Sequence, residues 1–482
     1  MNWILLVDIA YILILCLVCA RIVYDTNSSI KTLAYLMLAI FVPVAGMVFY
    51  FTVGINYRKR KLYSKKLITD DVLRKELGGR LVSRTGTILQ TQRDEIGYGD
   101  GLVNLLLKDS WSPLSGGNQV KLLFNGEEKF PELLEALKTA RHHIHIQYYI
   151  YEDDAIGNQI KEILIDKAQQ GVQVRFIYDD FGSRSIRKKM VKELHDAGIE
   201  AYPFNKIRLL FLANRINYRN HRRMVIVDGR TAFTGGINVS DRYINSGSGN
   251  EKYWRDTHLR LDGIACNYLQ YLFLCDWNFC AEKKLQPEPT YFNGTIHNTW
   301  DVAVQFAAGG PDSPTATILL SVLKAINIAK KEILITTPYF IPGESILDAL
   351  KVASLSGVNV KLLVPFKSDS KLVNAAAWSY YTDMIKMGVD VHLYKKGFIH
   401  AKTMVIDDNI SIIGSANMDY RSFELNFEVN TIVYNREITS QLKDAFYKDL
   451  EHAEMINIDR WEKRPMLKQL SERVARLLSP LL

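Results

Sequence analysis

The chain has 482 residues, which is longer than one typical domain and suits two or three. Hydrophobic residues make up 48% of it and charged residues 23%, so it can bury a sizeable core and is not a largely disordered chain. The formal net charge of +8 is compatible with an anionic partner such as nucleic acid or acidic lipid, but does not require one. Five cysteines, an odd and sparse set, argue against a disulfide framework and favour a main domain facing the reducing cytosol.

Two apolar runs open the chain, at residues 3–20 and 33–53. Each approaches the roughly 20 residues needed to cross a bilayer core. A short polar connector separates them, which predicts a transmembrane hairpin within residues 1–56. A cleaved signal peptide is the alternative for the first run, but this run lacks a basic leading region and a small-residue cleavage site.

Positive charge after the second run sets the expected orientation. Lysines and arginines are concentrated between positions 58 and 66, and fewer occur in the connector between the runs. Such a cluster stays on the cytoplasmic side and attracts anionic headgroups. We therefore expect a multi-pass membrane protein with its large C-terminal part on the cytoplasmic side. Residues 57–115 are expected to form a juxtamembrane basic segment and a linker.

The remainder of the chain repeats one plan. Strand-like runs alternate with helical segments in two copies, and the glycines between them recur at a nearly constant offset. The strand-like runs lie at residues 144–150, 172–179, 333–340 and 358–365. This alternation implies an α/β class with largely parallel strands. We expect two tandem α/β/α domains, over residues 116–300 and 301–482, which arose by duplication and face each other.

A histidine motif occurs once in each copy at matching places. His221 opens a β-patterned run that ends at Asp228, and His400 opens one that ends at Asp407. Residues two apart on a strand share a face, so each histidine points the same way as the cation two residues on. Those cations are Arg223 and Lys402. Small residues and an asparagine follow each run: Gly235, Gly236 and Asn238 in the first copy, and Gly414, Ser415 and Asn417 in the second.

Two facing copies would bring two histidines, two cations and two asparagine amides to one cleft. Such a set binds an anion and supplies a nucleophile and an acid, which suits phosphodiester chemistry without a metal. A neutral nucleophilic histidine needs a partner on its other ring nitrogen. Each copy offers a carboxylate downstream of its own histidine: Asp256 in the first copy and Glu428 in the second.

The second motif fits the pattern H-x-K-x4-D-x6-G-S-x-N of the phospholipase D superfamily completely. The first fits it with Arg223 in place of lysine and Gly236 in place of serine. Within that superfamily the whole chain resembles the bacterial cardiolipin synthases, through its N-terminal apolar runs and through residues 253–256 (YWRD), 338–342 (PYFIP) and 476–482 (RLLSPLL). The resemblance implies a pseudo-twofold pair of phospholipase D-like domains at the bacterial cell membrane. It also implies transfer of a phosphatidyl group between two phosphatidylglycerol molecules through a phosphatidyl-histidine, with no required metal or cofactor.

The resemblance further implies a role for each motif residue. His221 is then the nucleophile and His400 the acid and base, although the residues alone do not choose between them. Asp256 and Glu428 orient the histidines, and the two motif aspartates pair with nearby chain. The phosphate-binding positions are Asn238, Lys402, Ser415 and Asn417.

Other functions stay open at this point. A phospholipase D-type hydrolase, or a transferase with another donor or alcohol acceptor, would use the same residues. The predicted hairpin, and the lack of a dense basic and aromatic groove, disfavour a nuclease and a nucleic-acid partner. A non-catalytic scaffold that binds anionic lipid is weakly favoured by Arg223 and Gly236, but the complete second motif argues against it. Arginine also keeps the charge and can bind phosphate with two donors.

The C-terminal residues 466–482 carry leucines and a valine at helical spacing, with basic residues between them. Stripes of this kind usually pack on their own domain, and we expect that here. A helix that lies on the bilayer surface is the alternative.

Overall fold

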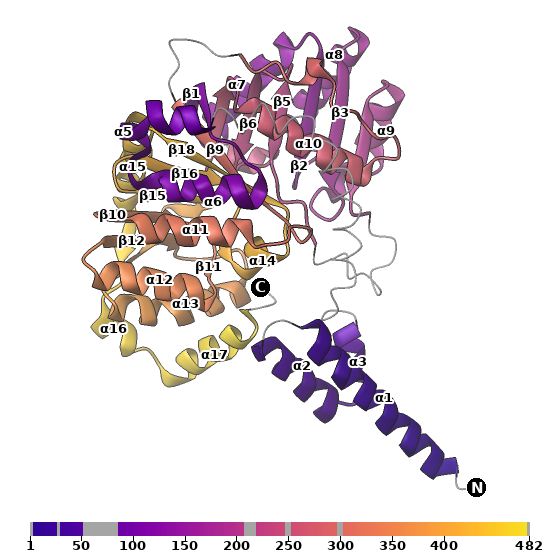
Figure 1. Ribbon diagram of the computed structural model, residues 1–482, viewed down its shortest axis with the longest axis vertical. Coiled ribbons are helices and arrows are strands. Elements are labelled where there is room, and N and C mark those ends of the chain that lie inside the picture. Colours follow the sequence, from indigo (N-terminus) through magenta and orange to yellow (C-terminus); the bar gives the residue numbers. More distant parts are fainter. Residues whose placement is uncertain are drawn as a thin grey trace.

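The computed structural model of the protein describes residues 3–26, 29–51, 85–206, 218–245, 252–295 and 302–479. Its centre is one 15-stranded sheet to which both halves of the chain contribute (Figure 1). The first half gives β1 (Ser115–Phe124), β2 (His143–Tyr148), β3 (Gln173–Asp179), β4 (Glu200–Phe204), β5 (Met224–Val227), β6 (Thr231–Gly235) and β8 (Thr257–Asp262). The second half gives β9 (Val302–Gly309), β10 (Glu332–Thr336), β12 (Asn359–Pro365), β13 (Asp390–Tyr394), β15 (Thr403–Ile406), β16 (Ile410–Gly414), β18 (Glu428–Tyr434) and β19 (Ala453–Met455).

The two halves meet at the middle of this sheet. β1 and β9 pair in antiparallel fashion, and outward from them the order is β8-β6-β5-β2-β3-β4 on one side and β18-β16-β15-β10-β12-β13-β19 on the other. Equivalent strands thus follow in the same order on both sides of the seam, with β19 added at one edge. This arrangement confirms the predicted α/β class and the pseudo-twofold pair of repeated domains.

The strands are less uniformly parallel than the sequence suggested. Among the described strands of the 15-stranded sheet, only β2-β3-β4 and β10-β12-β13 are parallel sets. The motif strands β5 and β15 each turn back sharply into β6 and β16, and such tight connections join antiparallel strands. The predicted glycines close helices before parallel strands, because they adopt the left-handed conformation that ends a helix: φ is 88° at Gly171 and 93° at Gly357.

Helices cover both faces of the sheet. One face carries α7 (Asn125–Thr139), α8 (Ala155–Gln169) and α9 (Lys189–Asp196) in the first half, and α11 (Thr317–Ile328), α12 (Glu344–Leu355) and α13 (Lys371–Lys386) in the second. Each half has its own apolar core on this face. The other face carries α10 (Cys266–Cys280) and α15 (Arg436–Leu450), and their core is continuous across both halves. The halves therefore share buried surface as well as backbone pairing.

The described end of the expected linker is helical. It contains α5 (Arg93–Ile96) and α6 (Asp100–Ser110). Leu102, Val103 and Leu106 of α6 are buried in the core of the second half, against α11 and β9. This segment therefore precedes the first half in sequence but packs on the second.

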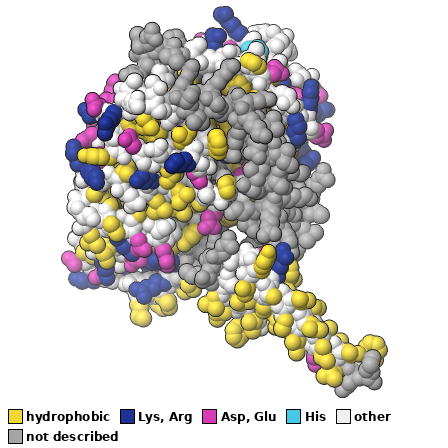
Figure 2. All heavy atoms as spheres, viewed as in Figure 1, with side chains coloured by type: hydrophobic (Ala, Val, Ile, Leu, Met, Phe, Trp, Pro, Cys, Tyr) yellow, Lys and Arg dark blue, Asp and Glu magenta, His cyan; other side chains and the backbone are white. Residues whose placement is uncertain are grey.

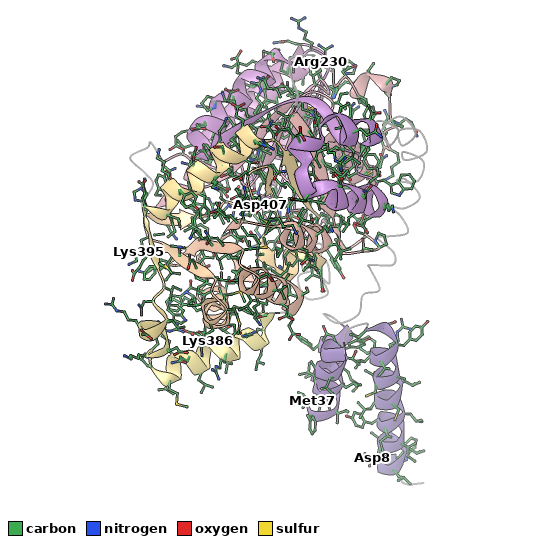
Figure 3. All side chains as sticks on the ribbon, turned by 60° about the vertical axis from the view of Figure 1, so that its left-hand side comes forward. Asp8, Met37, Arg230, Lys386, Lys395 and Asp407 are labelled. Carbon is green, nitrogen blue, oxygen red and sulfur yellow. The ribbon has the colours of Figure 1, made fainter. Side chains whose placement is uncertain are left out.

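The N-terminal hairpin is only partly present. α1 (Trp3–Asp25) contacts α2 (Ser29–Phe41), and both extend from the body of the molecule, as Asp8 and Met37 show in Figure 3. Among the described residues only Leu5–Asp25 is a helix long and apolar enough to cross a membrane. The second run is not one helix, because Pro43 lacks an N–H and Val44 has φ of 62°, so α2 ends and the short α3 (Ala45–Phe49) begins. The basic cluster at positions 58–66 lies outside the described residues.

The C-terminal helix departs from the expectation that its apolar stripe packs on its own domain. α17 (Met466–Leu477) follows α16 (Ile458–Glu462) and lies against α13. Its inward positions include Glu472 and Ala475, whereas its large apolar side chains are exposed. The prediction was wrong because periodicity reveals a stripe but not the side on which the neighbouring helix lies.

Candidate active site

Both motif histidines sit where backbone from the two halves crosses. His400 follows β14 (Gly397–Ile399), which pairs in parallel with β7 (Tyr253–Arg255) of the first half. The residue before His221 forms an equivalent bridge to Phe427 of the second half. The backbone N–H of His221 donates to the Phe427 carbonyl at 2.9 Å, and that of His400 donates to the Arg255 carbonyl at 2.7 Å. Each histidine is therefore held by the opposite half.

The histidine side chains are also paired across the halves. Nδ1 of His221 lies 2.8 Å from Oε1 of Glu428, and Nδ1 of His400 lies 2.6 Å from Oδ2 of Asp256. Both carboxylates are fully buried. The sequence had suggested that each carboxylate serves the histidine of its own copy, and the structure exchanges the partners. The exchange has a structural cause. β7 pairs with the strand before His400 and ends next to Asp256, and Phe427 pairs with the residue before His221 and precedes Glu428.

The surroundings keep both imidazoles neutral. Burial, reinforced by the nearby Arg223, lowers the pKa of His221 to about 4. Burial, reinforced by Lys402, lowers the pKa of His400 to about 3. A carboxylate beside Nδ1 accepts a hydrogen bond from the ring N–H at that position, so the proton stays on Nδ1 and Nε2 carries the lone pair. Each ring thus presents an unprotonated nitrogen on the side away from its carboxylate.

The two motif cations are buried beside the histidines. The Arg223 guanidinium donates to the His221 carbonyl at 2.9 Å, to Nε2 of His221 at 2.8 Å and to Oδ1 of Asn238 at 2.9 Å. Nζ of Lys402 donates to the His400 carbonyl at 2.5 Å. Burial lowers the pKa of Lys402 to about 7. Arginine at position 223 thus makes the carbonyl contact that lysine makes in the second copy and two further ones.

The glycine that departs from the motif is explained by the carboxylate beside it. In the second copy Oγ of Ser415 donates to Oε2 of Glu428 at 2.5 Å. In the first copy a Cβ atom at position 236 would lie 2.1 Å from Oδ1 of Asp256. The shorter aspartate therefore occupies the space of the missing side chain, and the pairs Gly236/Asp256 and Ser415/Glu428 are two solutions to one packing problem.

The two motif aspartates bind backbone rather than face the histidines. Asp228 accepts hydrogen bonds from three successive backbone N–H groups at the start of β2, and Asp407 accepts three at the start of β10. Both residues have positive φ, 52° and 53°, at the turn of their hairpin. Aspartate tolerates this conformation and satisfies the neighbouring N–H groups at once. Figure 3 shows Asp407 inside the body of the molecule.

A pocket of about 420 Å³ lies between the halves. Of the predicted site residues, it is lined by His221, Arg223, Asn238, His400 and Asn417. The carboxylates, Lys402 and Ser415 are not part of this lining; the carboxylates and Lys402 contact the histidines directly. Lys402 also lines a small adjoining cavity together with Asn417. The predicted histidines, cations, asparagines and carboxylate partners of both copies therefore lie at one site, whereas the two motif aspartates do not.

Several residues at this site were not predicted. The Tyr149 ring lies 4.7 Å from the His221 ring, and the Trp254 ring lies 5.7 Å from the His400 ring. Arg222 contacts both carboxylate oxygens of Asp276 at 2.8 and 2.7 Å and fixes the start of the motif strand to α10. Tyr149 is preceded by another tyrosine in an apolar run, so its sequence gives no signal that separates it from a core residue.

Comparisons with known proteins agree with this geometry. The family described as "Cardiolipin synthase, PLD-like domain" matches residues 133–251 and 322–450. The chain is 40% identical to the cardiolipin synthase of Alkalihalophilus pseudofirmus over 466 residues, covering 96% of this chain and 91% of the relative. It is 39% identical over 489 residues to the major cardiolipin synthase ClsA of Bacillus subtilis, covering 99% of each. Its fold is similar to that of the phosphatidylserine synthase of Haemophilus influenzae, with a TM-score of 0.59 and 14% identity over 80% of this chain and 100% of that one. The chain belongs to the cardiolipin synthase family of phospholipase D-like proteins.

Proposed function

We propose that this protein is a cardiolipin synthase that transfers a phosphatidyl group from one phosphatidylglycerol to a hydroxyl of a second, releasing glycerol. The observation that carries the proposal is the pair of neutral, carboxylate-bound histidines that meet at one cation-lined pocket. The relatives that match nearly the whole chain at about 40% identity are named cardiolipin synthases. The fold alone would leave the substrate open, since similar folds carry different chemistry.

In the first step the lipid phosphate binds beside Arg223, Asn238 and Asn417, and Lys402 contributes positive charge from behind the pocket lining. The Arg223 N–H that contacts Nε2 of His221 turns to the bound phosphate, and Nε2 attacks phosphorus with the lone pair that this frees, while the Glu428 contact keeps the ring proton on Nδ1. The bond between phosphorus and the glycerol oxygen breaks, and His400 donates a proton to that oxygen. The bound anion raises the low pKa of His400, so that the ring carries this proton only when substrate is present.

In the second step the roles reverse. His400, now neutral, takes the proton from a hydroxyl of the second phosphatidylglycerol, and that oxygen attacks phosphorus. The bond between Nε2 of His221 and phosphorus breaks, which releases cardiolipin and restores the starting state. The Asp256 carboxylate holds His400 in place throughout and stabilises its charged form. Exclusion of water favours the lipid alcohol, whereas entry of water would give phosphatidic acid.

The same proposal places the catalytic halves on the cytoplasmic side of the bacterial membrane. α1 supplies a helix long and apolar enough to anchor the chain. The basic cluster that follows the second apolar run favours the cytoplasmic side by the distribution of positive charge. A site fixed at the surface meets lipid headgroups without drawing a lipid through water.

The test is a lipid assay with purified, detergent-solubilised protein. Labelled phosphatidylglycerol is supplied as the only lipid, without added metal, and the products are separated. Cardiolipin and glycerol in equal amounts are expected, with none from the matched His221→Ala variant. Phosphatidic acid as the main product would show that the protein hydrolyses phosphatidylglycerol instead of transferring the phosphatidyl group. No product, even after phosphatidylethanolamine is added as a co-substrate, would contradict the proposal.

A further inference from the structure

The outer surface of α17 is apolar. Met466, Leu467, Leu470, Val474 and Leu477 are all exposed, Leu467 by 81% and Leu477 by 77% of their surface. Their spacing places them on one side of the helix. A contiguous exposed stripe of large apolar side chains is unusual for a surface that faces only water, and such surfaces mark contacts with proteins or membranes.

The orientation of α17 is fixed by a buried polar contact on its inner side and a partly exposed one at its margin. Glu472, only 3% exposed, pairs with Arg464 at 2.8 Å. Arg476 reaches Asp383 of α13 at 2.8 Å. Turning the helix to bury its leucines would expose or break these pairs. The fold therefore directs the apolar stripe outward through specific ion pairs.

Positive charge borders the stripe. Lys463, Lys468 and Arg473 are exposed on or beside the helix. Figure 2 shows hydrophobic and basic side chains together at the lower edge where Figure 1 places α17. An apolar stripe flanked by lysine and arginine has the chemistry of a helix that lies in the interface of an anionic bilayer. The same charges would repel each other if two copies met through this face.

The position of α17 in the molecule agrees with contact to a membrane surface. In Figures 1 and 3 α17 lies at the end of the body from which α1 and α2 extend. It packs against α13, and the start of α13 reaches the active-site pocket, which Ser370 and Val373 line. Leu372, between these two residues, is exposed by 43%. The helix on which α17 packs therefore carries an exposed leucine beside the pocket.

We propose that the outward stripe of α17 lies in the headgroup region of an anionic membrane and holds the pocket entrance against the lipid. This contact is a second attachment, separate from the anchor formed by α1. It does not depend on the proposed transferase activity, because a protein that only binds lipid would dock in the same way. The two proposals can therefore fail independently.

The test measures the depth of α17 directly. Cysteine replaces Leu470 in the full chain, after Cys16 and Cys19 of α1 are changed to serine, and an environment-sensitive fluorophore is attached. The protein is reconstituted in vesicles of phosphatidylglycerol and phosphatidylcholine that carry a quencher on the upper acyl chain. The matched control is Gln169→Cys, at the exposed end of α8, which lies at the opposite end of the molecule in Figure 1.

Strong quenching at position 470 and weak quenching at position 169 are expected. Equal quenching at the two positions would overturn the proposal. Disulfide cross-linking between two copies of the Leu470→Cys variant, with no quenching by lipid, would also overturn it and would assign the stripe to contact between copies.

A second measurement connects the contact to turnover. The double variant Leu470→Gln, Val474→Gln is expected to lose about tenfold in rate on vesicles, because two apolar side chains no longer favour the interface. Little loss is expected in detergent micelles, where lipid reaches the pocket without docking. Leu470→Phe, which keeps the surface apolar, is expected to keep the vesicle rate. An equal loss in vesicles and micelles, or a lowered melting temperature, would assign the stripe a structural role instead.

Discussion

Replacing Glu428 by glutamine tests the exchanged pairing most directly. The substitution keeps the size of the side chain and removes one buried charge. Glu428 contacts Nδ1 of His221 at 2.8 Å, Oγ of Ser415 at 2.5 Å and the Asn426 amide at 3.3 Å. It is fully buried and does not line the pocket, so the change reaches the substrate through His221, with a smaller effect through Lys402, whose pKa the Glu428 charge helps to raise.

The magnitude follows from two effects. A hydrogen bond to a charged group contributes about 1.5–3 kcal/mol, which corresponds to roughly 10- to 100-fold in rate. A glutamine can also present its amide N–H to Nδ1, which moves the ring proton to Nε2 and blocks attack on phosphorus. In serine proteases the equivalent aspartate-to-asparagine exchange lowers kcat by about 10⁴-fold. We expect kcat to fall by about 10²- to 10⁴-fold, with KM nearly unchanged.

The assay is cardiolipin formation at saturating phosphatidylglycerol, with single-turnover measurement of the phosphoryl-enzyme. Ser415→Ala is the matched control, because it removes one hydrogen bond to Glu428 but leaves the charge, and a loss below about tenfold is expected. A Glu428→Gln enzyme that keeps kcat within about threefold of the parent would refute the argument that this charge sets the state of His221.

Four further outcomes are expected. His221→Ala and His400→Ala each abolish turnover without loss of folding, as measured by product formation and melting temperature. Arg223→Lys keeps kcat within about tenfold, since lysine at this place in the second copy makes the same carbonyl contact; complete loss would show that the first copy depends on arginine. Gly236→Ser lowers kcat because the Cβ of the new serine collides with Asp256, and adding Asp256→Glu restores part of kcat. No recovery in the double variant would contradict the argument that Gly236/Asp256 and Ser415/Glu428 are alternative packings of the same place. The melting temperature falls as pH is lowered from about 6.5 toward 4, because both histidines have pKa values in the folded state below the unfolded value near 6.5, so the unfolded chain binds more protons in that range; a flat profile would contradict the low pKa values.

Spacing along the sequence was enough to predict the repeat and the meeting of the two motifs. The offset between His221 and His400 matches that of the surrounding strands, and a duplicated domain brings equivalent positions to one axis. The partners of the histidines were not predictable in the same way. Asp256 and Glu428 follow short segments that cross between halves, and pairing between distant segments leaves no periodic signal in either one.

Two departures from the sequence predictions concern helices at the ends of the chain. Composition identified two apolar runs, but α2 ends before Pro43, so within the described residues the second run is two shorter helices rather than one. Helical spacing identified the stripe on α17, but its orientation depends on the ion pair between Glu472 and Arg464. Hydropathy and periodicity are averages over many residues, so neither reveals the effect of a single proline or a single buried charge on a helix.

The exchange of partners between the halves also bears on when the enzyme becomes active during synthesis. The first half leaves the ribosome with His221 but without Phe427 or Glu428, which hold its backbone and its ring. Lipid cleavage therefore cannot begin until nearly the entire polypeptide has been made and closed on itself. A fragment that contains only the first half therefore lacks both groups that hold His221, and we expect it to be inactive towards lipid.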